Sequence, residues 1–144
     1  MSDRALPLKG RTALVTGAAK RIGRAVALAL AEAGADVVVH YRGSGDEAEA
    51  TASLIRQTGP RAWCIQADLA DGDQAGELLA HAAKTASGPV DILVNNASAF
   101  TADTVMDFTP QSLLASVQLH AMAPLTLARA FAAQRIPAGD IVNF

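Results

Sequence analysis

A glycine-rich turn flanked by two cations is the part of the sequence best suited to hold a phosphorylated ligand. It lies in Arg11–Gly23 (RTALVTGAAKRIG), where a short apolar run ends at a glycine and a helical pattern begins at Ile22. Gly17 can adopt a backbone conformation that other residues avoid, and free N–H groups at a helix start attract anions. Lys20 and Arg21 add positive charge. The segment therefore predicts a pyrophosphate-binding turn.

The residues after the second apolar run could select between dinucleotides. No Asp or Glu occurs between Val37 and Gly45, although an acidic residue at this place binds the ribose 2′-hydroxyl of NAD. Arg42 could instead pair with the 2′-phosphate of NADP through two hydrogen bonds. The alternative is that Arg42 is a solvated loop charge. His40 and Tyr41 suit packing against the adenosine, or the surface, better than catalysis. The pattern favours NADP(H) as the cofactor.

Alternating strands and helices must position these residues. Strands are expected at 12–16, 37–40, 62–66, 91–94 and 140–144, and helices at 22–33, 44–59, 71–88 and 109–134. This alternation indicates βαβ units, a parallel sheet and helices on both faces. Ligands of such sheets bind beyond the carboxyl ends of the strands, where the strand order reverses. The expected fold is a single α/β domain, residues 1–144, of the Rossmann type, whose doubly wound sheet stops after the fifth strand.

Helix boundaries have their own signals. Ser44 and Glu47 have the spacing of a capping box. Asp71 is a suitable N-cap for the third helix, and Thr109–Pro110 supplies a cap and a first-turn proline for the long fourth one. Pro124 is expected to kink that long helix.

The composition is that of an ordinary globular protein. The 144 residues are 51% hydrophobic and 18% charged with a net charge of −2, which gives no reason to expect nucleic acid or a membrane as a partner. Cys64 is the only cysteine, so no internal disulfide can form, and its apolar surroundings predict a buried strand residue. There is no apolar run of about 20 residues, no signal-peptide core and no pattern of metal ligands. We expect a cytoplasmic protein.

Two motifs together resemble the short-chain dehydrogenase/reductase family. The family turn reads T-G-x-x-x-G-x-G, and this sequence has Thr16-Gly17 and Gly23, with Arg21 in place of the middle glycine. The family also has N-N-A-G after the fourth strand, where this chain reads NNAS over 95–98. The two motifs at the correct spacing are more specific than either alone, and the resemblance covers essentially all 144 residues.

The resemblance implies roles for residues at the later strand ends. Asp68, followed by Leu69, occupies the position from which the family binds the adenine amino group; helix capping is the alternative. Asn95 corresponds to the asparagine that ties neighbouring strands together. Ala97 and Ser98 belong to the backbone that lies along the nicotinamide ribose.

Four segments are most similar to the pteridine reductases, particularly to the bacterial dihydromonapterin and dihydrofolate reductase type. They are TGAAKRIG, HYR, NNASAF and QLHAMAPLTLARAF. The similarity implies an NADPH-dependent oxidoreductase that reduces a dihydropterin-like small molecule. A 3-oxoacyl thioester or a sugar ketone is the alternative substrate. In the long helix, His120 takes the position of a family asparagine that holds a proton-relay water; it could hold a water or donate a proton, or it could be a packed helix residue.

The catalytic half of the family is not found in this sequence. Family reductases use a Ser after the fifth strand and a Tyr-x-x-x-Lys on the next helix, whereas the only tyrosine here is Tyr41 and the sequence ends at Phe144. The resemblance thus covers the cofactor half of a reductase, which in the family forms dimers or tetramers through the helix expected at 110–134. A non-catalytic nucleotide-binding module is the alternative.

We therefore expect residues 1–144 alone to lack reductase activity. Without the Tyr and Lys, no proton donor is placed beside the cofactor. Purified 1–144 would be assayed for NADPH oxidation with carbonyl compounds and dihydropterins. Turnover above the rate without protein would contradict the expectation.

Overall fold

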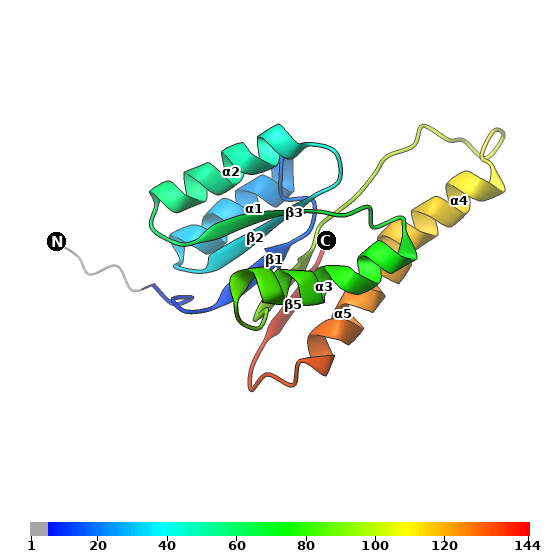
Figure 1. Cartoon of the computed structure of the whole chain (residues 1–144). Coiled ribbons are helices and arrows are strands. Elements are labelled where there is room, and N and C mark those ends of the chain that lie inside the picture. The colour runs from blue at the N-terminus through cyan, green and yellow to red at the C-terminus, as the bar shows by residue number, and fades with distance from the viewer. Residues whose placement is uncertain (1–5) are drawn as a thin grey trace.

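The computed structural model describes residues 6–144 and shows a parallel sheet between two layers of helices (Figure 1). Five strands pair in the order β3-β2-β1-β4-β5. The doubly wound α/β fold predicted from the alternation is therefore confirmed. The strands are β1 (Thr12–Val15), β2 (Asp36–Tyr41), β3 (Ala62–Gln66), β4 (Ile92–Asn95) and β5 (Asp140–Asn143), and the helices are α1 (Arg21–Glu32), α2 (Gly45–Gln57), α3 (Gly72–Ala86), α4 (Pro110–Val117), the π-helical turn η1 (Gln118–Met122) and α5 (Ala123–Ala133).

Alternating side chains of the central strands fill two separate cores. Ala13 and Val15 of β1 pack in one core with α1 and α2, while Leu14 between them packs in the other core with α3 and α5. All three side chains are fully buried. A strand buried on both faces is an apolar run and not an alternating one, which is why β1 is visible in the sequence.

The strand order reverses beside β1, which pairs with β2 on one side and β4 on the other. The helix that follows β1 and the helix that follows β4 therefore lie on opposite faces, and their loops diverge above the carboxyl ends of the two strands. Such a divergence leaves a crevice in doubly wound sheets. The predicted turn and the NNAS segment both lie at this point.

All three predicted N-cap residues directly precede their helices, but the capping box expected at Ser44 does not form. The Asp71 carboxylate accepts hydrogen bonds from two backbone N–H groups of α3, and Thr109 forms a capping box with Ser112. Ser44 makes no side-chain capping bond. Its expected partner Glu47 is drawn instead toward Lys20, whose Nζ lies 3.7 Å from the Glu47 carboxylate.

The long fourth helix changes its winding just before Pro124. Residues Gln118–Met122 form a π-helical turn, with the Ala123 N–H bonded to the Gln118 carbonyl five residues earlier. Pro124 has no N–H to continue the regular ladder, and at the position of the expected kink the structure shows this change of winding. On its N-terminal side, α4 has no buried residue, and Figure 1 shows it extending away from the sheet.

Cys64 lies on β3 as predicted but is not fully buried. Its thiol is partly exposed and donates a hydrogen bond to Glu49, 3.4 Å away, from the neighbouring α2. Partial burial and the adjacent carboxylate raise the pKa of Cys64 to about 11. The thiol therefore stays protonated and is a poor nucleophile. Within residues 6–144, no helix combines the length and the hydrophobicity needed to cross a bilayer.

Candidate functional site

A groove of about 470 Å³ lies above the carboxyl ends of β1, β2, β3 and β4. A second pocket adjoins it above β4 and β5. Most predicted site residues line the groove, whereas Asn95 and His120 line only the second pocket. The predicted residues that line the groove are Gly17, Lys20, Arg21, Ile22, His40, Tyr41, Arg42, Asp68, Leu69, Ala97 and Ser98.

The glycine turn brings the chain close to the segment after β4. Gly17 has a φ of +64°, and a Cβ on it would lie 2.9 Å from the Cα of Ala97. A Cβ on Gly23 would collide with the Gly17 carbonyl. Arg21, which replaces the middle glycine of the family turn, keeps a left-handed φ of +54°. Arginine tolerates this region poorly, so the turn is held in shape by its surroundings.

The N-terminus of α1 opens into this groove. Lys20 makes no side-chain capping bond there, and the first turn contains no acidic residue. The first N–H groups of a helix have no partner within the helix, so they face the groove together with the positive end of the dipole. Side chains of Lys20 and Arg21 add two exposed cations at its rim. This arrangement suits a pyrophosphate.

A cluster of hydrogen bonds joins the ends of β1 and β4. The Thr16 hydroxyl oxygen accepts from the backbone N–H groups of Asn96 and Ala97, both at 2.9 Å. The Asn96 amide donates to the carbonyls of Thr16 and Gly17. The sequence analysis gives neither side chain a role; the second Asn of the NNAS segment is the signal that could have indicated one.

Asn95 also joins neighbouring strands, consistent with the role that the resemblance implies. Its amide donates to the Asn143 side chain of β5 at 2.8 Å. Its own Oδ1 is buried without a partner among the described residues. Asn95 thus faces the second pocket and not the groove.

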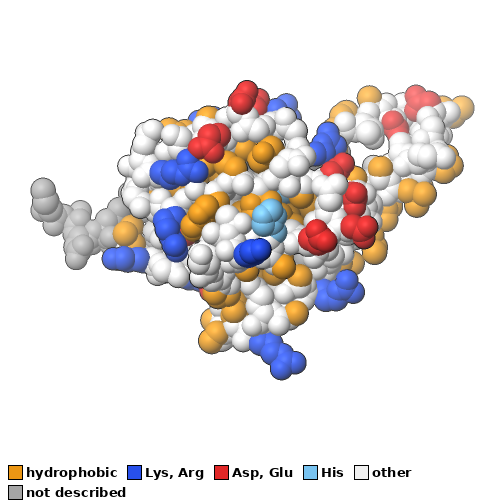
Figure 2. All heavy atoms as spheres, in the orientation of Figure 1, with side chains coloured by type: hydrophobic (Ala, Val, Ile, Leu, Met, Phe, Trp, Pro, Cys, Tyr) orange, Lys and Arg blue, Asp and Glu red, His pale blue; other side chains and the backbone are white. Residues whose placement is uncertain are grey.

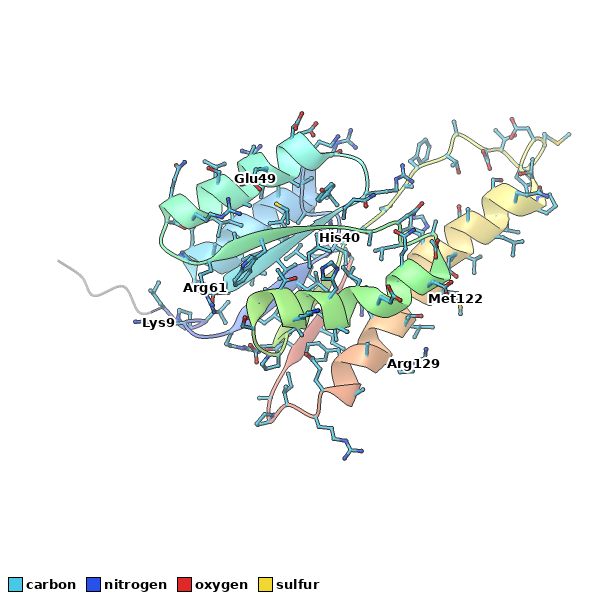
Figure 3. All side chains as sticks on the ribbon, in the orientation of Figure 1. Lys9, His40, Glu49, Arg61, Met122 and Arg129 are labelled. Atoms are coloured by element: carbon cyan, nitrogen blue, oxygen red, sulfur yellow. The ribbon has the colours of Figure 1, made fainter. Side chains whose placement is uncertain are left out.

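His40 is a buried bridge beneath the groove. Its Nδ1 accepts from the Gly17 N–H at 3.0 Å, and its Nε2 donates to the Ala67 carbonyl at 2.9 Å. Figure 3 shows it in the interior, beside the sheet. Burial lowers the pKa of His40 and outweighs the opposing effects of the Ala67 carbonyl and Asp68. The ring is therefore neutral and supports the glycine turn.

The loops after β2 and β3 form the other end of the groove. Arg42 is exposed there, and no ion pair engages it within residues 6–144. Its carbonyl accepts from the Gln66 amide at 2.9 Å, which fixes the loop. Tyr41 is half-buried beside it. The free guanidinium could bind a phosphate.

Asp68 and Leu69 follow β3 at the floor of the groove. The Asp68 Oδ1 accepts from the Ala70 N–H at 3.0 Å, so this carboxylate shapes its own loop, while Asp71 caps α3. Leu69 is buried in the core with α3. An adenine ring placed here would contact an apolar floor and a partly exposed carboxylate.

His120 lies in η1 with both ring nitrogens beside protein atoms. Nδ1 is 3.0 Å from the Ser116 carbonyl, and Nε2 is 3.1 Å from the Ser98 hydroxyl and 3.3 Å from the Ala99 N–H. The ring itself is exposed at the second pocket. A catalytic role for His120 stays a prediction.

The fold and the groove are those of a nucleotide-binding α/β domain, and comparison with known proteins identifies its family. The model of the short chain dehydrogenase family matches residues 11–144. The chain belongs to this family.

Similar proteins are longer than this chain. A 3-oxoacyl-(acyl-carrier-protein) reductase FabG of Staphylococcus epidermidis is 47% identical over 87 residues, which are 60% of this chain and 35% of that protein. An uncharacterized oxidoreductase of Methylorubrum extorquens is 35% identical over 94% of this chain and 54% of its own length. The chain thus spans about half the length of the relative that it matches almost throughout.

Solved structures give the same result. A short chain dehydrogenase from Burkholderia cenocepacia in complex with NADP has a TM-score of 0.90 and 37% identity over 95% of this chain and 56% of that one. The landomycin C-6 ketoreductase LanV with bound NADP and rabelomycin has a TM-score of 0.87 and 35% identity over 95% of this chain and 58% of its own.

The neutral bridge of His40 predicts a pH dependence of stability. An unfolded histidine takes up a proton near pH 6.5, whereas folded His40 resists it because burial lowers its pKa. The contribution of His40 to the free energy of unfolding is therefore fully present above about pH 6.5. It decreases at lower pH, by at most about 1.4 kcal/mol per pH unit for one proton. Substituting His40 by Gln should flatten this slope.

The measurement is thermal denaturation of the complete protein between pH 8 and pH 5. His81→Gln, which changes an exposed histidine of α3, is the control and should keep the original slope. An unchanged slope in His40→Gln would show that other groups cause the acid sensitivity.

Proposed function

We propose that the complete protein is an NADPH-dependent reductase that transfers hydride to a carbonyl group. The observation that supports it most strongly is the groove itself, in which a glycine turn, an open helix N-terminus and a free arginine lie along one crevice. The family membership and the NADP in the two solved relatives support the same function.

The residues present suit each part of the cofactor. Pyrophosphate would bind at the N-terminus of α1, the adenine beside Asp68, and the 2′-phosphate at Arg42 with help from Arg21. The nicotinamide ribose would lie along the segment that contains Ala97 and Ser98. When bound, NADPH supplies the hydride. The chain's own part is to position the dinucleotide and to neutralise its phosphates.

Arg42 should determine the preference for NADPH. A charge-assisted hydrogen bond to a phosphate contributes roughly 1.5–3 kcal/mol, so Arg42→Ala should weaken NADPH binding about tenfold to a hundredfold. NADH, which has no 2′-phosphate, should bind almost as before. Dissociation constants of both cofactors, measured by fluorescence titration, test this.

Arg129→Ala provides the matched control, because Arg129 is an exposed arginine of α5 that does not line the groove (Figure 3). It should leave both constants unchanged. Equal losses for NADPH and NADH in Arg42→Ala would mean that Arg42 supports the loop and does not bind the phosphate.

A ketone or a 3-oxoacyl thioester is the substrate class that we favour. Two of the similar proteins are named as reductases of such groups, FabG and LanV. A dihydropterin is the second candidate, supported by the segments TGAAKRIG, HYR and NNASAF. None of the similar proteins described above is named as a pteridine reductase, so this branch stays a prediction from the sequence.

Steady-state assays decide between the two classes. We expect kcat/KM for an acetoacetyl thioester or an aromatic ketone to exceed that for a dihydropterin by at least about tenfold. The complete protein would be assayed with NADPH and each compound in parallel. A higher kcat/KM with a dihydropterin would reverse the assignment.

We also propose that the complete protein is a homo-oligomer, a dimer or a tetramer, formed through 110–134. This segment exposes a row of large apolar side chains, and Figure 2 shows hydrophobic atoms along its outer face. The exposed side chains are Leu113, Leu114, Val117, Met122 and Leu125, between 45% and 67% accessible.

The cytoplasmic location stays a prediction.

A further inference from the structure

Two residues that depart from the family pattern contact each other. Ser98 replaces the glycine of N-N-A-G, and His120 replaces the asparagine of the long helix. They are 22 positions apart, yet the Ser98 hydroxyl lies 3.1 Å from the Nε2 of His120. The two departures therefore form one structural unit.

The partners of the His120 ring define where its proton is. Nδ1 faces the carbonyl oxygen of Ser116 at 3.0 Å, and since a carbonyl can only accept, Nδ1 must carry the hydrogen. Nε2 faces the N–H of Ala99 at 3.3 Å, which can only donate, so Nε2 must be bare. The neutral ring thus accepts at Nε2 from Ala99 and shares that lone pair with the Ser98 hydroxyl.

This contact connects a loop with a turn of helix that lies 22 residues further along the chain. Ser98 and Ala99 belong to the loop that leaves β4, whereas His120 lies in η1, where the helix is wound more loosely than on either side. Ser98 lines both the groove and the second pocket, while His120 lines the second pocket alone. The hydrogen bond therefore holds the loop at Ser98, which lies between the groove and the second pocket.

We propose that Ser98 and His120 act together as a positioning pair for the reaction. The pair holds the loop after β4 at the end of the groove where, on the function proposed above, the nicotinamide and the reducible group meet. In this role His120 is a hydrogen-bond acceptor, and it does not transfer a proton to the substrate.

A double-mutant cycle on the complete protein tests the coupling. Ser98→Ala and His120→Leu should each lower kcat/KM about tenfold, mainly through KM, and the double variant should be no worse than either single one. His120→Gln keeps an acceptor near the position of Nε2 but cannot exchange a proton at neutral pH. It should therefore retain kcat/KM within about threefold of the unsubstituted protein.

His81→Leu is the matched control, because His81 is exposed on α3 and lines neither space; it should change nothing. Losses that multiply in the double variant would show that the two residues act independently. A loss of kcat/KM in His120→Gln as large as in His120→Leu, with kcat falling in both and a limb of the pH–rate profile lost, would make His120 a proton donor and overturn the proposal.

Nitrogen-15 NMR of the histidine rings provides a test that needs no activity. His120, assigned by the loss of its signals in His120→Gln, should be the Nδ1–H tautomer, while His40 should be the Nε2–H tautomer. An Nε2–H tautomer at His120 would refute the pair even in an active reductase. The expected tautomer in a protein without reductase activity would leave the pair intact and refute only the proposed function.

Discussion

The hydroxyl of Thr16 is the point on which the site depends. It accepts from two successive N–H groups of the segment after β4, and it also donates to the Val94 carbonyl at 3.3 Å. The strand order reverses here, so the loops after β1 and β4 would diverge if nothing joined them. Together with the Asn96 amide, this buried side chain therefore fixes the distance between the phosphate end of the groove and the end where the proposed reaction occurs.

Other hydrogen bonds also hold the backbone of the glycine turn in place. His40 holds the Gly17 N–H from below, the Asn96 amide holds its carbonyl from the side, and the buried Thr51 of α2 donates to the carbonyl of Ala19 at 3.1 Å. These bonds come from β2, from α2 and from the segment after β4, at separations of 23, 32 and 79 residues from the groups that they hold. They explain how Arg21 can keep a left-handed φ that arginine rarely adopts. Such a preorganised turn need not rearrange when an anion binds.

The sequence predicted what is encoded locally. Strands buried on both faces are continuous apolar runs, and Asp71 and Thr109 mark helix starts because their own neighbours supply the N–H groups. Ser44 also precedes its helix, but its capping box does not form, and Glu47 lies instead beside Lys20, the residue before α1. Cys64 is less buried than predicted, because an apolar run does not show which of its residues lies at the edge of a layer.

For the candidate site, the sequence named the groove residues but not their connections. Gly17, Arg42 and Asp68 could be found because parallel strands present their ends at one edge. The contacts of Thr16 with Asn96, and of Ser98 with His120, span 80 and 22 residues. Their existence depends on tertiary geometry, which no local pattern specifies. The resemblance indicates the positions of Ser98 and His120, and only the folded structure shows their contact.

The lack of buried residues in α4 has a consequence for the folding of this region. An eight-residue helix is too short to be stable in water by its own hydrogen bonds, because helix nucleation is unfavourable and few bonds follow it. The capping box of Thr109 and Ser112 lowers that cost at one end only, and η1 continues the helix at the other. The helix–coil equilibrium of α4 must therefore depend on whatever surface covers Leu113, Leu114 and Val117, so that ordering and contact form a single cooperative step.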